Sequence, residues 1–186
     1  MAARPRLVLL DAGAVIHAHR SGGWAQLCTA YDVIVPAIVA GEASFFLDAD
    51  NKRQPIDLSP DFVAGRVQQY QASVTDFAAT VASLPDALRL RVHDGELEAL
   101  TYLRTVGTKD TAFLSGDGGA IEATVVLGFS NVAMSLERAL QLCGITKSLP
   151  PEHTEAFIAE AKQRGGVTLA QYAIPKPAIR KQRKPR

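Results

Sequence analysis

Residues 7–13 read LVLLDAG, and this short stretch decides the fold that the sequence predicts. Four consecutive apolar residues are typical of a parallel strand buried on both faces, and the turn residues Asp11 and Gly13 close it. A second apolar run, at 33–35, is separated from the first by the helical pattern of residues 24–31. This order predicts two parallel strands joined by a crossover helix.

The same alternation of strand and helix continues along the chain. Further buried strands are predicted at 111–114 and 131–133, and residues 88–92 alternate as in a short strand. Helices are predicted at 36–47, from 59 to Tyr70, at 73–84, 96–106, 120–127 and 135–142, and at 151–164 before Gly165 and Gly166. We therefore expect an α/β fold of three layers (α/β/α), with helices on both faces of a central, mainly parallel sheet.

The chain has the size and composition of one globular domain. Its 186 residues, 47% of them apolar and 21% charged, suffice for one full hydrophobic core. We expect a main domain at 1–145, with a loop or hairpin inserted near 48–58, followed by a helical extension at 146–174. No apolar run approaches the roughly 20 residues of a membrane span, and the first residues lack the apolar stretch of a secretory signal. These features favour a cytoplasmic protein with no membrane partner.

The last residues, 175–186, form a basic tail. The tail has no acidic residue, and its basic residues are Lys176, Arg180, Lys181, Arg183, Lys184 and Arg186. Such a segment attracts phosphate groups without reading sequence, so these residues are candidates for nucleic-acid binding. A disordered, solubilising end is the other interpretation of the same composition.

Four carboxylates follow predicted strands or open predicted helices. Asp11 comes directly after one apolar strand and two residues before a glycine, and Asp117 comes three residues after another strand and between two glycines. Glu42 and Glu96 lie in the first two turns of their helices. Ligands of open parallel sheets bind beyond the carboxyl ends of the strands, where the loops converge. We therefore expect Asp11, Glu42, Glu96 and Asp117 to share one site at that edge.

Four carboxylates at one site would repel one another unless a cation neutralised them. Mg²⁺ and Mn²⁺ prefer oxygen ligands, and a bound water activated by such an ion attacks phosphodiesters. Asp11 and Asp117 are the expected metal ligands, and Glu42 and Glu96 complete the site or orient the water. Ser115 is an expected accessory residue, and Glu98 is the other candidate for the third acid.

Four segments carry a resemblance to the PIN-domain family of metal-dependent nucleases. They are LLDAG ending at Gly13, VPAIVAGE ending at Glu42, GELEAL starting at Gly95 and LSGD ending at Asp117. The resemblance implies an α/β/α fold, one or two Mg²⁺ or Mn²⁺ ions, and a ribonuclease that cleaves RNA at the four acids. Because the family is best known for toxins of toxin–antitoxin pairs, it also implies an antitoxin protein as a partner, and a homodimer is left open.

Each site residue also has a structural interpretation. Asp11 and Asp117 suit turns or helix caps, and Glu42 and Glu96 suit helix surfaces or first turns. His17 suits a surface histidine, and His153 has no partner in sequence. The rival to a ribonuclease is therefore a non-catalytic or weakly active module that binds RNA or is regulated by a partner.

Overall fold

The computed structural model describes residues 6–173 and is built on a five-stranded sheet. The strands lie in the order β5-β2-β1-β6-β7, and every neighbouring pair is parallel. Their bounds are β1 (Leu7–Leu10), β2 (Asp32–Pro36), β5 (Val67–Tyr70), β6 (Thr111–Leu114) and β7 (Ala133–Met134). The predicted α/β fold with a central parallel sheet is confirmed.

The strand order reverses between β1 and β6. From β1 the chain moves outward to β2 and then β5, and it returns to pair β6 against the other side of β1 before adding β7. Because the sheet is parallel, all strands end at the same edge. The loops after β1 and β6 therefore diverge at a switch point, which is where such sheets bind ligands.

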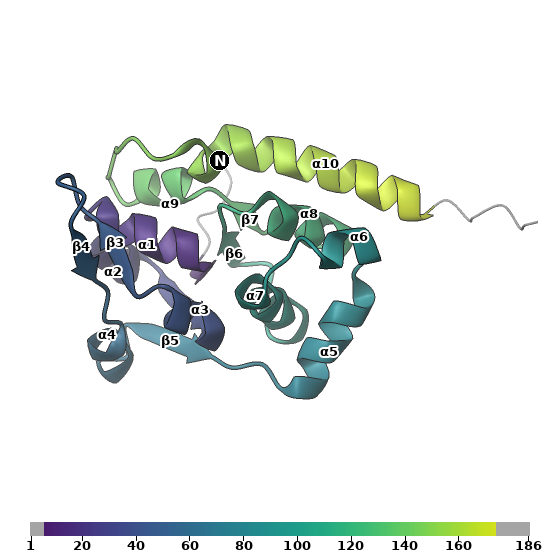
Figure 1. Cartoon of the computed structure of the whole chain (residues 1–186), viewed down its shortest axis with the longest axis horizontal. Helices are drawn as coiled ribbons and strands as arrows, with labels where there is room; N and C mark the ends of the chain where they lie inside the picture. Colours follow the sequence, from purple (N-terminus) through teal and green to yellow (C-terminus); the bar gives the residue numbers. More distant parts are fainter. Residues whose placement is uncertain (1–5, 174–186) are drawn as a thin grey trace, which may run out of the picture.

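Helices cover both faces of the sheet, as Figure 1 shows. Side chains of β1 alternate between two cores: Val8 and Leu10 pack on one face with Leu27, and Leu9 packs on the other with Leu100. The first face is covered by α1 (Ala12–Arg20), α2 (Trp24–Ala30), α3 (Ala37–Glu42) and α9 (Leu136–Leu142). The second is covered by α5 (Val74–Ser83), α6 (Asp86–Arg89), α7 (Asp94–Thr105) and α8 (Gly118–Val126).

The segment that was expected near 48–58 as a loop or hairpin is a hairpin. Strand β3 (Phe45–Leu47) pairs antiparallel with β4 (Arg53–Pro55), and Asn51 takes the positive φ of 61° that the turn requires. The short helix α4 (Ser59–Val63) follows.

Several elements differ from the sequence prediction. The helix expected over 36–47 ends at Glu42, because the backbone leaves the helical conformation at Ala43 and Phe45–Leu47 pair with β4 instead. The helix expected to reach Tyr70 stops early, because Gly65 takes a φ of +68° and the chain then pairs with β2 as the edge strand β5. The strand expected at 88–92 is instead the helix α6 and a turn. Leu88 and Val92 are both buried there, a spacing of four residues that suits a helix as well as a strand.

The C-terminal extension consists of η1 (Pro151–His153) and α10 (Glu155–Ala173). The predicted end of this helix at Gly165 is wrong, because α10 continues through both glycines and packs along α8 (Figure 1). A Cβ at Gly165 would lie 2.8 Å from the Cβ of Val125, so glycine there permits the close approach of the two helices. No helix within residues 6–173 is long and apolar enough to cross a membrane. The basic tail at 175–186 lies outside the described residues.

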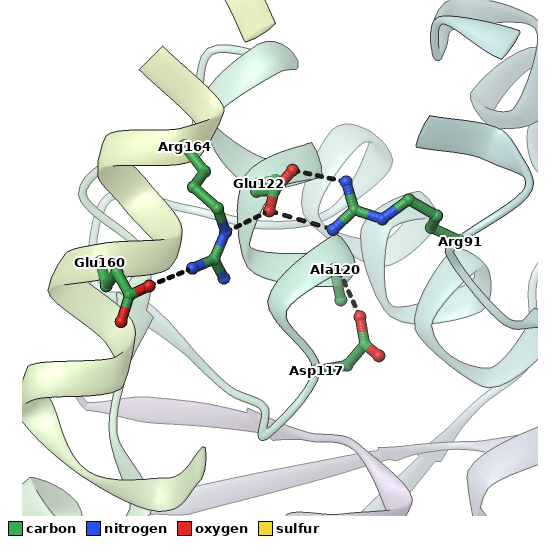
Figure 2. Close-up of polar contacts among 6 residues, drawn as sticks. All are labelled: Arg91, Asp117, Ala120, Glu122, Glu160 and Arg164. Carbon is green, nitrogen blue, oxygen red and sulfur yellow. Dashed lines mark hydrogen bonds and ion pairs between the residues drawn. The ribbon is translucent and has the colours of Figure 1, made fainter. Parts of the chain in front are cut away.

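A buried carboxylate fastens α10 to the rest of the molecule (Figure 2). Glu122 of α8 is 2% exposed and accepts hydrogen bonds from Arg91 at 2.9 and 3.0 Å and from Arg164 of α10 at 2.7 Å. Burial raises the pKa of Glu122, but the bonds to Arg91 and Arg164 outweigh burial and hold that pKa below its ordinary value. We call these three residues the Glu122 clamp.

The substitution Glu122→Gln is expected to lower the free energy of unfolding by about 2 kcal/mol in urea titrations, because an amide leaves one guanidinium poorly paired. Because the folded pKa is depressed, the clamp stabilises the protein above the ordinary carboxyl value of 4.5 and this contribution fades in more acidic solution. Glu160→Gln is the matched control, since Glu160 also pairs with Arg164 but its side chain is 70% exposed. The control is expected to cost less than about 0.5 kcal/mol, and equal losses in the two variants would contradict the clamp.

Candidate functional site

A pocket of about 240 Å³ opens at the switch point between β1 and β6. Its polar lining comes from four parts of the chain, and its residues are Asp11, Gly13, His17, Glu96, Gly116, Asp117, Glu152 and His153. A larger hollow of about 600 Å³ lies elsewhere and has a mostly apolar lining that includes Val74 and Phe77. Position and chemistry, rather than size, single out the pocket at the switch point, which we call the acidic pocket.

Asp11 closes the end of β1 and joins it to the loop after β6. Its Oδ1 accepts a hydrogen bond from the backbone N–H of Ala14 at 2.6 Å, which caps α1, and its Oδ2 accepts from that of Gly116 at 3.0 Å. The residue is only 4% exposed. Burial raises the pKa of Asp11 above its ordinary value, although hydrogen bonds with Ser115 and with the two backbone groups oppose the rise.

Asp117 opens α8 from the neighbouring loop. Its Oδ1 accepts from the backbone N–H of Ala120 at 2.7 Å, and its own N–H donates to Ser115 Oγ at 3.0 Å (Figure 2 draws the first bond). Within residues 6–173, the Oδ2 atom of Asp117 makes no hydrogen bond. Ser115 is 1% exposed and holds the turn, whereas Asp117 keeps one oxygen for the pocket.

Glu96 enters the pocket from the first turn of α7. Its Oε2 accepts from the backbone N–H of His93 at 2.6 Å and lies 3.2 Å from His93 Nδ1. Burial, followed by the negative charge of Asp117, raises the pKa of Glu96 to about 7. One ligand atom each of His93, Glu96 and Asp117 lies within 4.8 Å of the others, a separation at which one cation could be shared.

The structure brings together three of the four predicted acids. Asp11, Glu96 and Asp117 line the acidic pocket, although Asp11 does not belong to the tighter group formed by Glu96, Asp117 and His93. Glu42 is exposed at the end of α3 and does not line the pocket. Its Oε2 would lie 3.0 Å from a Cβ placed on Gly95, the residue before Glu96, so Glu42 is a neighbour of the site.

Glu98, the other candidate for the third acid, lies outside the pocket. It is 3% exposed, and its two oxygens accept from the backbone N–H groups of Ile38 at 2.8 Å and Ala72 at 2.9 Å. Glu98 therefore joins the start of α3 to the segment after β5. Of the two glutamates, only Glu96 has a place in the acidic pocket.

Two histidines also line the acidic pocket, although their meeting was not predicted. The rings of His17 in α1 and His153 in η1 lie 4.5 Å apart, and His153 is 2% exposed. Burial lowers the pKa of both, and the nearby charge of His153 lowers that of His17 further. The C-terminal extension thus supplies part of the pocket, and only the folded arrangement reveals it.

The same substitution at Glu96 and at Glu98 is expected to change stability in opposite directions when metal is removed with EDTA. Glu98→Gln is expected to lower the free energy of unfolding by about 1 to 3 kcal/mol, since an amide cannot accept from both N–H groups. Glu96→Gln keeps the acceptor for His93 and removes a charge that the folded state disfavours. The pKa of Glu96 is raised from the ordinary carboxyl value of 4.5 to about 7 in the folded protein. The wild type therefore loses stability as the pH rises from 4.5 toward 7.

Glu96→Gln is therefore expected to be more stable than the wild type at about pH 8, with most of the gain gone at about pH 5. Urea titrations of the wild type and both variants at the two pH values measure this. A Glu96→Gln variant that is less stable than the wild type at the higher pH would show that Glu96 is only a helix cap.

Comparisons with family models, with curated proteins and with solved structures found no match to this chain. The likeness to PIN domains therefore rests on the four sequence segments quoted above. Three of them, ending or starting near Asp11, Glu96 and Asp117, supply acids to the acidic pocket.

Proposed function

We propose that the protein is a Mg²⁺- or Mn²⁺-dependent ribonuclease whose reaction takes place in the acidic pocket. The observation that carries this proposal is the convergence of Asp11, Glu96 and Asp117 from three separate elements on one open pocket at the switch point. Ionised together, these groups repel one another, and the charges of Asp117 and Asp11 add to burial in raising the pKa of Glu96. A divalent cation removes that conflict.

The residues present suit a hard cation. Asp117 has one oxygen without a hydrogen bond in the described chain, and Glu96 lies close enough to share an ion with it. Asp11 adds a third carboxylate, and oxygen donors of this kind are the ligands that Mg²⁺ and Mn²⁺ prefer. When bound, the cation would supply positive charge that stabilises the attacked phosphodiester and favours deprotonation of the attacking water.

The side chains of the pocket would position the cation and orient the attacking water. Asp11 is held by two backbone N–H groups, so its carboxylate is fixed between β1 and the loop after β6. Ser115 fixes the backbone of Asp117 in the same way. Glu96 lies beside Asp117 and would hold the cation with it or orient the attacking water. Preorganised groups of this kind need no rearrangement when charge develops.

RNA is the substrate that the PIN-like segments favour. The pocket opens at the surface, so a polymer can reach it, and the basic tail at 175–186 would add phosphate contacts that do not depend on sequence. The proposal includes a cytoplasmic location, and an antitoxin protein or a second copy of the chain as a regulator.

One observation favours a second function. Glu42 does not line the acidic pocket, so the four-acid set expected from the PIN resemblance is not fully assembled. A weakly active or non-catalytic module that binds RNA, or that is regulated by a partner, would need no fourth ligand. Metal-dependent turnover separates this alternative from a ribonuclease.

Purified protein is expected to cleave a pool of single-stranded and structured RNA with Mn²⁺ or Mg²⁺ and to be inactive in EDTA. Asp117→Asn is the sharpest variant, because asparagine Oδ1 can still cap Ala120 while the charge is lost. Asp117→Asn and Glu96→Gln are each expected to lower the cleavage rate by about 100-fold or more. Asp11→Asn is less informative, since its amide would face the N–H of Gly116 and disturb the fold.

Asp94→Asn is the matched control for the cleavage assay. Asp94 is an exposed acid in the first turn of α7, two residues before Glu96, and does not line the acidic pocket. Its substitution is expected to leave the rate unchanged. RNA binding without cleavage in every condition would refute the ribonuclease and support the binding module.

Mg²⁺ binding should depend on pH through Glu96. The cation binds the ionised carboxylate, whose pKa is about 7 without metal. The affinity measured by calorimetry is therefore expected to rise about tenfold per pH unit below neutrality and to level off above it. Glu96→Gln removes the carboxylate that titrates, so the affinity of this variant for Mg²⁺ should be weaker and should vary much less with pH. Equal pH profiles in the two proteins would exclude Glu96 from the cation's surroundings.

A further inference from the structure

A second group of ligand atoms lines the acidic pocket, apart from the group of His93, Glu96 and Asp117. One atom each of His17, Glu152 and His153 lies within 4.8 Å of the others. The two rings lie 4.5 Å apart, His17 coming from α1 and the other two residues from η1 in the C-terminal extension. Residues from opposite ends of the chain therefore meet at one point.

The burial of His153 indicates that this group has an unfilled role. His153 is 2% exposed, and within residues 6–173 its Nδ1 has no hydrogen-bond partner although it is shielded from solvent. A buried polar atom without a partner costs about 1 to 3 kcal/mol, so such atoms call for a ligand or another function. A metal cation is one candidate, because the lone pair of a ring nitrogen can bind it.

Two glycines make room for the His153 ring. A Cβ at Gly116 would lie 2.7 Å from His153 Cε1, and a Cβ at Gly13 would lie 3.4 Å from the same atom. Gly116 follows β6 and Gly13 lies in the first turn of α1, so the ring is seated directly on the switch point. The seat exists because neither position carries a side chain.

We propose that His17, Glu152 and His153 form a second cation site, which takes Zn²⁺ or a similar borderline divalent ion. Two imidazoles and one carboxylate are the donors that Zn²⁺ favours, whereas Mg²⁺ favours the all-oxygen side of the pocket. Three protein ligands leave a further position open for water or a substrate oxygen. The site goes beyond the proposed ribonuclease, because it requires neither RNA nor the ionised Glu96.

Such an ion would tie the extension to the core. Glu152 and His153 precede α10, which the Glu122 clamp fastens to α8, while His17 belongs to a helix on the first face of the sheet. A cation held between η1 and α1 would bridge the extension and the core. Because the ion would bind the folded chain and not the unfolded one, it would stabilise the fold. Zn²⁺ is therefore expected to raise the melting temperature as well as to bind.

The test is calorimetric titration of Zn²⁺ into the full chain with excess Mg²⁺ present, which occupies the acidic side. The wild type is expected to bind one Zn²⁺ per chain. His17→Gln and Glu152→Gln are each expected to weaken Zn²⁺ binding by at least about tenfold. Loss of a residue that merely supports a metal ligand already costs about that much affinity. Both should also abolish the Zn²⁺-dependent rise in melting temperature.

Two controls separate this site from others. His19→Gln changes a histidine of the same helix that stacks on Trp24 and belongs to neither ligand group, and Asp117→Asn disables the acidic side. Both are expected to keep Zn²⁺ binding.

Three results would overturn the proposal: no Zn²⁺ binding by the wild type, binding that His17→Gln and Glu152→Gln leave unchanged, or loss of the same binding in Asp117→Asn. Because no RNA is present, the outcome is independent of whether the protein cleaves RNA.

Discussion

The two hydrogen bonds accepted by the Asp11 carboxylate hold the switch point together. One oxygen caps α1 through Ala14, and the other accepts from Gly116 in the loop after β6. A single side chain thus fixes two strand ends whose loops lead in opposite directions. The geometry of the acidic pocket follows from this constraint, because Gly116 and Asp117 are adjacent and the histidine seat is formed by Gly13 and Gly116. Asp11 therefore has a structural role whether or not it binds a metal.

The constraint has an electrostatic consequence. Glu96 is buried at the start of α7 near the charges of Asp117 and Asp11, and burial followed by these charges raises its pKa to about 7. The N–H of His93 lowers that pKa but does not cancel the effect. A helix cap alone would not require three acids at one pocket. The Glu122 clamp shows one way to resolve such a conflict, since two arginines neutralise its buried carboxylate. The proposed cation would do the same for the acidic pocket.

The sequence predicted the strands that are buried on both faces and the placement of Asp11 and Asp117 just beyond the ends of two of them. The apolar run of β1 is only four residues long and ends in turn residues, which favours a strand over a helix, so Asp11 could be placed at a strand end. Strand β5 was missed because only Val67 of its four residues is buried, and an edge strand of that kind gives no clear period. Glu96 and Glu98 differ by two positions, which puts them on different sides of a helix, and only packing reveals which side faces the pocket. His153 could not be placed, since its contacts with Gly13 and Gly116 join distant parts of the chain.

The extension is more than an appendage to the predicted main domain. Gly165 lets α10 approach Val125 of α8, Arg164 donates to the buried Glu122, and η1 delivers Glu152 and His153 to the pocket. The helix packing and the clamp fasten α10 to α8, and η1, which precedes α10, places His153 against Gly13 and Gly116. Without the extension the pocket would keep its three acids and His17 but would lose Glu152 and His153. The extension thus adds an imidazole and a carboxylate to a pocket whose other acids come from the predicted main domain, and this is where the chain departs furthest from what its acidic segments alone imply.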